Sequence, residues 1–145
     1  MKKQTLAIHT AYPSKDAYGA LSMPVYHAAA YEFDNAADMA DAFCGRVTAP
    51  DYSRVMNPTV MNLENRVKAL TGAQAVVALN SGMAAISNTL LALASAGKNI
   101  VSSRHMFGNT YSLITETLPR FGVESHACDL TDLSQVEKAV DENTC

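Results

Sequence analysis

The segment from residue 75 to residue 86, AVVALNSGMAAI, most limits the folds that this chain can adopt. A short apolar run rich in Val ends in Asn80-Ser81-Gly82, and small residues suited to a closely packed helix follow at once. The pattern predicts a strand, a tight turn and a helix. The first backbone N–H groups of such a helix have no intrahelical partners and lie at the positive end of the helix dipole. The turn is therefore a candidate site for a phosphate group.

Each residue of this turn suits an anion site. Gly82 lets a ligand approach the backbone closely, Ser81 offers a hydroxyl donor, and either Asn80 or Ser81 can cap the helix. The motif lacks the lysine of a P-loop and the glycine triplet of a dinucleotide-binding fingerprint. Most Ser-Gly turns between a strand and a helix bind nothing. The residues alone therefore leave two alternatives open, an anion-binding turn and a turn with only a structural role.

Composition excludes several classes of protein. The chain has 145 residues, 48% of them hydrophobic and 17% charged, with a formal net charge of -3. These values favour a globular fold with a core and give no electrostatic reason to expect nucleic acid as a partner. No long apolar segment follows the basic amino terminus, so we expect a cytoplasmic protein that does not bind a membrane. The cysteines and histidines lack ligand spacing, so neither a disulfide framework nor a metal site is predicted.

The first 57 residues differ from those that follow. They contain Pro13, Pro24 and Pro50, scattered aromatic residues, and a single plausible helix at 36–43, capped by Asp34 or Asn35. An arm of this composition lies along another surface, either its own domain or a neighbouring subunit. We therefore divide the chain into an arm, residues 1–57, and the first part of an α/β domain, residues 58–145.

After the arm, helices and strands alternate. The predicted helices span 58–71, 82–96, 107–118 and 133–140, and the predicted strands span 75–79, 99–102 and 123–128. Strand and helix alternation favours a parallel sheet with helices on its faces and ligands near the carboxyl ends of the strands. Three strands form a narrow parallel sheet with exposed edges, so we expect this chain to be the amino-terminal portion of a longer protein.

Two further segments are candidates for a site, one with an arginine and one with an aromatic residue. The planar fork of Arg54 matches phosphate oxygens, and Tyr52 projects to the same side if the segment is extended. The commoner arrangement is an arginine paired with a carboxylate and a tyrosine that covers the core. Phe107, beside Gly108 at a predicted strand-to-helix turn, either stacks on a planar cofactor or lies in the core. These alternatives stay open on the residues alone.

Three motifs taken together resemble one enzyme family. They are Tyr52-Ser53-Arg54 followed by Asn57-Pro58-Thr59, then NSGMAAI at 80–86, and then FGNTY at 107–111. In order and spacing they resemble the pyridoxal-phosphate enzymes of cysteine and methionine metabolism, which include the cystathionine synthases and lyases, methionine γ-lyase and O-acetylhomoserine sulfhydrylase. The arm segments 5–9, 24–26 and 31–33 also resemble this family. The resemblance covers nearly the whole chain.

The resemblance implies the amino-terminal part of a fold-type I transferase, with an extended arm and the start of a mainly parallel sheet with flanking helices. It also implies a homotetramer, a dimer of dimers in which each active site is shared between subunits. Ser81, Gly82 and Met83 would then bind the phosphate of pyridoxal 5'-phosphate. Tyr52 and Arg54 would reach the phosphate of the cofactor in the partner subunit, and Tyr52 would assist proton transfer at the substrate amine.

Some residues depart from the family pattern. The family usually has Tyr at the position of Phe107, where the ring stacks on the pyridine ring of the cofactor. Phe keeps this stacking and loses the hydroxyl, so the resemblance implies no acid role for the ring. Methionine γ-lyases tend to have Cys at the position of Asn109, and this departure favours O-acetylhomoserine sulfhydrylase. His27 and Ala28 replace residues with hydroxyl or amide groups that are usual in the arm.

The resemblance places the covalent cofactor lysine, the aspartate that pairs with the pyridine nitrogen and the substrate-carboxylate arginine beyond Cys145. No lysine of the chain lies in a matching motif: Lys2, Lys3, Lys15, Lys68, Lys98 and Lys138. The expected activity is γ-replacement on an O-activated homoserine, a small amino acid substrate, to give homocysteine or methionine. The alternatives are methionine γ-lyase or cystathionine γ-lyase or synthase activity, a non-catalytic fragment with only the phosphate-binding part of a site, and a generic phosphate- or nucleotide-binding domain.

Overall fold

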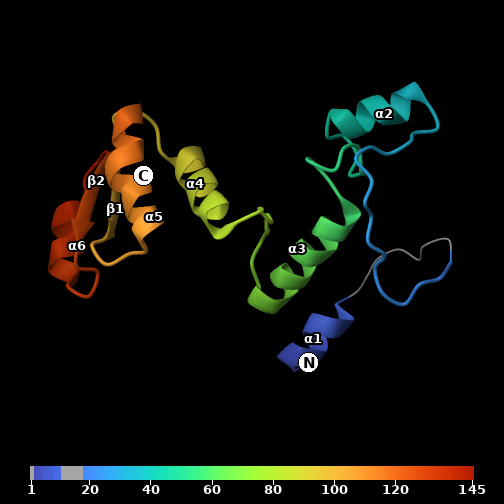
Figure 1. Cartoon of the computed structure of the whole chain (residues 1–145), viewed down its shortest axis with the longest axis horizontal. Helices are drawn as coiled ribbons and strands as arrows, with labels where there is room; N and C mark the ends of the chain where they lie inside the picture. The colour runs from blue at the N-terminus through green and yellow to red at the C-terminus, as the bar shows by residue number, and fades with distance from the viewer. Residues whose placement is uncertain (1, 11–17) are drawn as a thin grey trace. The chain divides into compact units, whose positions relative to one another are not determined.

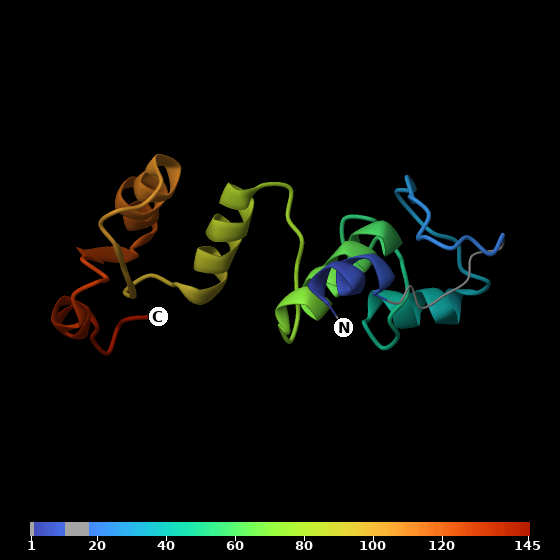
Figure 2. The ribbon, with the colours of Figure 1, turned by 90° about the horizontal axis from the view of Figure 1, so that it is seen from below.

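The computed structural model describes residues 2–10 and 18–145. The chain divides into two compact units, residues 1–78 and residues 79–145, whose ribbons are shown in Figures 1 and 2. Within the described ranges, no helix is long and apolar enough to cross a membrane. The first unit contains the predicted arm and the helix that follows it. Contact between that arm and a neighbouring subunit stays a prediction.

The first unit contains the helices α1 (Lys3–His9), α2 (Ala36–Phe43) and α3 (Pro58–Thr71). The predicted bounds of α2 and α3 are confirmed because both helices begin at strong local capping signals. The side chain of Asn35 accepts a hydrogen bond of 2.9 Å from the N–H of Asp38. The side chain of Asn57 accepts one of 2.9 Å from the N–H of Thr59, and Pro58 follows as the first helical residue.

Helix α1 corrects the expectation of a single helix in the first 57 residues. Seven residues are too few for a stable isolated helix, so the sequence periodicity gives no clear signal. The helix packs against α3, and Arg66 Nη1 donates to the carbonyl oxygen of Ala7 at 2.9 Å. A positive side chain at the carboxyl end of a helix is favourable, because unpaired carbonyl groups lie there. Tertiary contact therefore stabilises α1.

The second unit confirms the predicted alternation of strands and helices. It contains, in chain order, α4 (Gly82–Leu93), β1 (Asn99–Ser103), α5 (Gly108–Ser112), the π-helical turn η1 (Leu113–Thr117), the 3₁₀ turn η2 (Leu118–Phe121), β2 (Glu124–Cys128) and α6 (Leu133–Ala139). Strands β1 and β2 pair in parallel, from Asn99 opposite Glu124 to Ser103 opposite Cys128. The helical segment between them forms the crossover that a parallel pair requires, as Figure 1 shows.

The core of the second unit is small. Four buried side chains form its apolar cluster: Ile100, Ile114, Leu118 and Val123. Leu90 and Ala94 of the α4 end and Leu113 of the crossover pack against this cluster. The same apolar contacts therefore join α4, β1 and the crossover.

The predicted strand at 75–79 is wrong for the described chain. A strand requires a hydrogen-bonded neighbour, and none of the described residues forms a ladder with this segment. The N–H of Ala78 donates instead to Glu64 Oε1 of α3 at 2.8 Å. The turn and the helix that follow are confirmed, with Ser81 as the cap and Leu93 as the last residue rather than Ala96.

The predicted helix at 107–118 changes its hydrogen-bond pattern along its length. Only Gly108–Ser112 is α-helical, and a π-helical turn and a 3₁₀ turn follow. Pro119 has no N–H to donate, and the pattern changes just before it. The chain continues to Phe121 and ends at Gly122, whose φ of 78° favours glycine.

The second unit should lose stability in acid. Hydrogen bonds from the Ser134 side chain and then from Gln135 hold the pKa of Asp132, the α6 cap, below its usual value of 3.8. Hydrogen bonds from the Asn99 side chain and the Asn143 backbone likewise lower the pKa of Asp141. A depressed pKa stabilises the fold above the unfolded value, and this stability is lost as the pH falls through the folded value.

We therefore expect the melting temperature to fall progressively between about pH 5 and pH 2. Asp132→Asn keeps an oxygen that can cap α6 and removes the titrating group, so its melting temperature should fall less over this range. Thermal melts followed by circular dichroism measure both. Identical pH profiles for the variant and the parent would contradict the assignment to Asp132.

Candidate phosphate-binding site

The amino terminus of α4 presents two backbone donors that have no acceptor in the described chain. Ser81 caps the helix, and its Oγ accepts a hydrogen bond of 3.0 Å from the N–H of Ala84. The carbonyl oxygen of Ser81 accepts another of 3.0 Å from Ala85. No hydrogen bond from the N–H groups of Gly82 or Met83 is present among the described residues. These two donors are the ones that the sequence predicts for a phosphate group.

The start of α4 has no negative charge of its own. The first turn of α4 contains no acidic residue, and its cap is neutral. The start of α2, by contrast, contains Asp38, and α6 is capped by Asp132. A Cβ atom built on Gly82 would meet no atom within 4 Å, so the space beside these donors is open. This helix end can therefore accept an external anion such as a phosphate group.

The turn before α5 lies close to the same helix end. Thr110 Oγ1 donates to Met83 Sδ at 3.7 Å, and the two helices are in contact. Phe107, three residues earlier, is 73% exposed. Of the two positions that the sequence allows for this ring, the one in the core is therefore wrong. The second unit thus presents open backbone donors and, on a helix in contact with them, an exposed aromatic ring.

In the first unit, Tyr52 and Arg54 lie together, but not for the predicted reason. The segment is not extended, because the N–H groups of Val55 and Met56 donate to the carbonyl oxygen of Tyr52 at 2.8 and 2.9 Å and form a turn. This turn places Arg54 Cζ 5.1 Å from the centre of the Tyr52 ring, within the range of a cation–π contact.

The described structure shows neither an arginine paired with a carboxylate nor a tyrosine that covers the core. Among the described residues, the ion pair that forms joins Arg46 to Asp41, so Arg54 has no carboxylate partner there. The side chain of Arg54 is exposed, and that of Tyr52 is 41% exposed rather than part of a core. Arg54 therefore keeps its N–H donors available for an anion.

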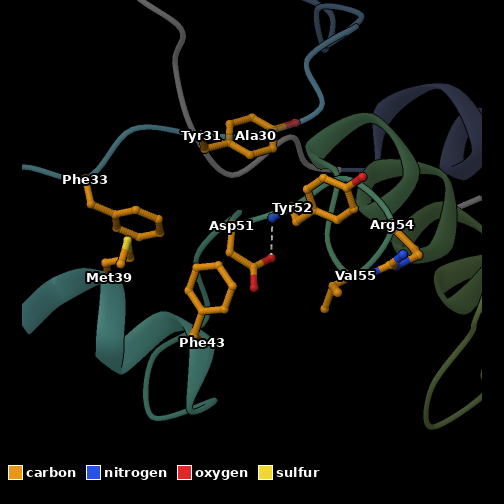
Figure 3. Close-up of a pocket in the computed structure, with 9 residues that line it drawn as sticks. All are labelled: Ala30, Tyr31, Phe33, Met39, Phe43, Asp51, Tyr52, Arg54 and Val55. Atoms are coloured by element: carbon orange, nitrogen blue, oxygen red, sulfur yellow. Dashed lines mark hydrogen bonds between the residues drawn. The ribbon is translucent and has the colours of Figure 1, made fainter. Parts of the chain in front are cut away.

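A cavity of about 400 Å³ adjoins this pair, and the sequence does not predict it. Its walls include Phe33, Met39 and Phe43, as Figure 3 shows. Asp51 lies beside it and accepts a hydrogen bond of 2.6 Å from the N–H of Tyr52. The aromatic residues scattered along the arm are the signal of this cavity, but their spacing does not reveal which of them converge.

The structure brings predicted site residues together within each unit. Tyr52 meets Arg54 in the first unit, and Met83 lies close to the Phe107 turn in the second. A single site that combines the two groups, directly or across subunits, stays a prediction.

The parallel strand pair with its helical crossover belongs to the fold-type I class of pyridoxal-phosphate-dependent enzymes, to which its structural neighbours belong. The model of the Cys/Met metabolism PLP-dependent enzyme family matches residues 4–145. The chain is a member of this family.

Its similarity to characterised members extends along almost the whole chain. It is 39% identical to the L-methionine gamma-lyase of Fusobacterium nucleatum subsp. nucleatum over 99% of this chain and 37% of that protein. It is 37% identical to the O-acetyl-L-homoserine sulfhydrylase of Corynebacterium glutamicum over 97% of this chain and 32% of that protein. The chain therefore spans about a third of the length of the relatives that it matches.

A solved structure from Campylobacter jejuni, of a proposed O-acetylhomoserine (thiol)-lyase, matches with a TM-score of 0.93 and 38% identity. The match covers 99% of this chain and 34% of that one. That protein contains N'-pyridoxyl-lysine-5'-monophosphate, and pyridoxal phosphate is the cofactor of the family.

Gly82→Ala should separate anion binding from folding. The added methyl group meets no atom of the chain, and Ala is favoured over Gly in a helix by about 0.5–1 kcal/mol, so the stability should stay the same or rise. The methyl group fills the space beside the two donors, so the affinity for pyridoxal 5'-phosphate should fall. Calorimetric titration with the cofactor and denaturant unfolding measure the two effects.

Asn88→Ala, on an exposed position of the same helix, is the matched control. It should leave the affinity unchanged. Unchanged affinity in Gly82→Ala, or an equal loss in both variants, would refute the assignment of these donors.

Proposed function

We propose that this chain supplies the cofactor-phosphate part of an enzyme that performs γ-replacement on an O-activated homoserine, as in O-acetylhomoserine sulfhydrylase, to give homocysteine or methionine. The open, uncharged amino terminus of α4 is the observation that supports this most, because it offers two unused donors in open space. The relatives named as sulfhydrylases support the choice of reaction, as does Asn109 in place of the Cys that methionine γ-lyases tend to have.

In this proposal, the N–H groups of Gly82 and Met83 bind the phosphate group of the cofactor. The Ser81 hydroxyl, whose oxygen already accepts from Ala84, donates its hydrogen to the same phosphate. The exposed ring of Phe107 stacks on the cofactor and excludes water from that face. Pyridoxal phosphate, when bound, supplies an electron sink for reaction at the substrate carbon atoms.

Tyr52 and Arg54 act at the cofactor of a partner subunit in the proposed dimer of dimers. The guanidinium group of Arg54 binds phosphate oxygens, and its lack of a carboxylate partner among the described residues supports this role. The hydroxyl group of Tyr52 assists proton transfer at the substrate amine. The contact between the guanidinium group and the tyrosine ring keeps the two side chains together.

The second candidate is γ-elimination, the reaction of a methionine or cystathionine γ-lyase. The similarity to the Fusobacterium nucleatum L-methionine gamma-lyase favours it. In elimination, water rather than a sulfur nucleophile completes the reaction. The two candidates use the same proposed cofactor contacts, so a product assay is needed to distinguish them.

The proposed enzyme, prepared with the lysine-bearing segment that the resemblance implies beyond Cys145, should convert O-acetylhomoserine and sulfide to homocysteine faster than it releases methanethiol from methionine. Both products are measured by mass spectrometry, and the intact mass of the same sample establishes the length of the polypeptide assayed. Faster methanethiol release would favour the lyase, and turnover of neither substrate would contradict both candidates.

Arg54→Ala should weaken cofactor binding far more than folding. Loss of a charge-assisted phosphate contact should raise the dissociation constant of pyridoxal 5'-phosphate by about tenfold or more. The stability should change by only about 0.5–1 kcal/mol, because the exposed side chain makes a single cation–π contact among the described residues. Fluorescence titration and denaturant unfolding measure the two quantities.

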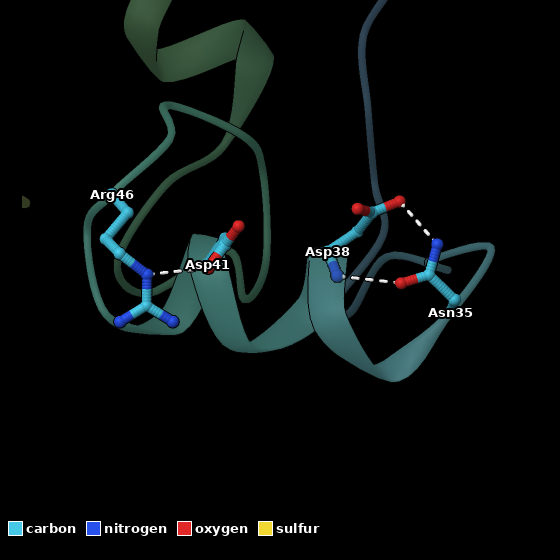
Figure 4. Close-up of polar contacts among 4 residues, drawn as sticks. All are labelled: Asn35, Asp38, Asp41 and Arg46. Atoms are coloured by element: carbon cyan, nitrogen blue, oxygen red, sulfur yellow. Dashed lines mark hydrogen bonds and ion pairs between the residues drawn. The ribbon is translucent and has the colours of Figure 1, made fainter.

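Arg46→Ala is the matched control, since this exposed arginine pairs with Asp41 at 2.6 Å (Figure 4). It should leave cofactor affinity unchanged. Equal effects on affinity and stability in Arg54→Ala, or the same loss of affinity in both variants, would overturn the proposed role of Arg54.

A further inference from the structure

We propose that Asn57, together with Ser53 and Tyr31, is a positioning group that fixes the turn presenting Tyr52 and Arg54. This inference rests on the proposed function, because it assigns to these three side chains an effect on the cofactor that acts through Arg54. We call the three residues the Asn57 network.

The Asn57 side chain joins four parts of the first unit. It is 9% exposed, and its Oδ1 caps α3 through the N–H of Thr59. Its Nδ2 lies 2.8 Å from Ser53 Oγ, 3.1 Å from the carbonyl oxygen of Tyr26 and 3.2 Å from Tyr31 Oη. One buried amide group therefore connects the start of α3, the Tyr52–Arg54 turn and two points of the arm.

The donors and acceptors of this network can be assigned. Ser53 Oγ donates its single hydrogen to the carbonyl oxygen of Ala28. It must therefore act as the acceptor from Asn57 Nδ2 and from Tyr31 Oη, which lies 3.3 Å away. The Tyr31 oxygen in turn accepts from Asn57. Every hydroxyl hydrogen in the network has an acceptor. The two hydrogens of Asn57 Nδ2 are shared among three acceptors, so removal of one member changes how the remaining hydrogen bonds are shared.

The backbone reinforces the same junction. The N–H of Ser53 donates to the carbonyl oxygen of Ala29 at 2.9 Å, and the N–H of Tyr31 donates to that of Asp51 at 3.2 Å. These bonds flank an antiparallel bridge between Ala30 and Tyr52. Arg54 thus lies between two fixed residues, Ser53 on one side and Asn57 at the start of α3.

The direction of the Arg54 side chain depends on this turn. Arg54 is exposed and its contact among the described side chains is with the Tyr52 ring, which belongs to the same turn. Among the described residues, no hydrogen bond or ion pair from outside the turn holds the guanidinium group. A binding group placed about 1 Å from its productive position loses much of its effect, so the rigidity of the turn should determine how well Arg54 binds phosphate.

Tyr31→Phe tests the inference, because it keeps the ring and removes the hydroxyl group. The dissociation constant of pyridoxal 5'-phosphate should rise by about fivefold, the change expected from the loss of one net hydrogen bond. In an Arg54→Ala background, the same substitution should leave the dissociation constant unchanged. Its effect on the urea midpoint of unfolding should be the same in both backgrounds. If the Tyr31 hydroxyl had only a structural role, Tyr31→Phe would change the dissociation constant equally in both backgrounds, as it does the urea midpoint.

Two further variants keep the test decisive. Asn57→Ser retains an oxygen to cap α3 and loses the amide donors, so it should weaken cofactor binding as Tyr31→Phe does. Thr71→Val removes the hydrogen bond of 2.8 Å from Thr71 to Val67 at the far end of α3 and should not change the affinity.

The outcomes separate this inference from the proposed function. If Arg54→Ala weakens cofactor binding but Tyr31→Phe does not, the Asn57 network is refuted and the role of Arg54 stands. An equal effect of Tyr31→Phe in both backgrounds also refutes it. If Arg54→Ala leaves the affinity unchanged, both proposals fail.

Discussion

The small apolar cluster of the second unit is the interaction on which the candidate phosphate site depends. A helix of the length of α4 is marginal in water by itself, so packing must maintain it. Leu90 and Leu113 contact the cluster from α4 and from the crossover, and Thr110 bonds to Met83 at the other end of α4. Each fully buried side chain of this kind contributes about 1.5–3 kcal/mol. The open backbone donors and the exposed Phe107 ring are thus presented by elements that share one core.

Electrostatics gives both units the same preference for an anion. Among the described helices, α2 has an aspartate in its first turn and α6 has one as its cap, whereas α3, α4 and α5 have neutral caps and no acidic residue in the first turn. Arg54 likewise lacks a carboxylate partner in the described chain. Since the chain as a whole has a net charge of -3, these local donors do not follow from its composition. These donors stay available because no acidic residue lies in the first turn of α4 and no described carboxylate pairs with Arg54.

Local signals made part of this structure predictable. The caps at Asn57 and Ser81, and the parallel pairing of β1 with β2, follow from short-range chemistry and from the alternation of elements. Long-range contacts explain the failures. The segment 75–79 has strand composition but no neighbouring strand in the described chain, and α1 depends on Arg66. The proximity of Tyr52 to Arg54 arises from a turn closed by backbone hydrogen bonds, which residue spacing does not reveal.

The central claim is that the amino terminus of α4 binds the phosphate group of the family cofactor. A crystal structure of the protein with pyridoxal 5'-phosphate tests it most directly. The account predicts phosphate oxygens within about 2.7–3.2 Å of the backbone nitrogens of Gly82 and Met83. A phosphate bound elsewhere, with these two nitrogens hydrogen-bonded to water or to protein groups, would contradict it.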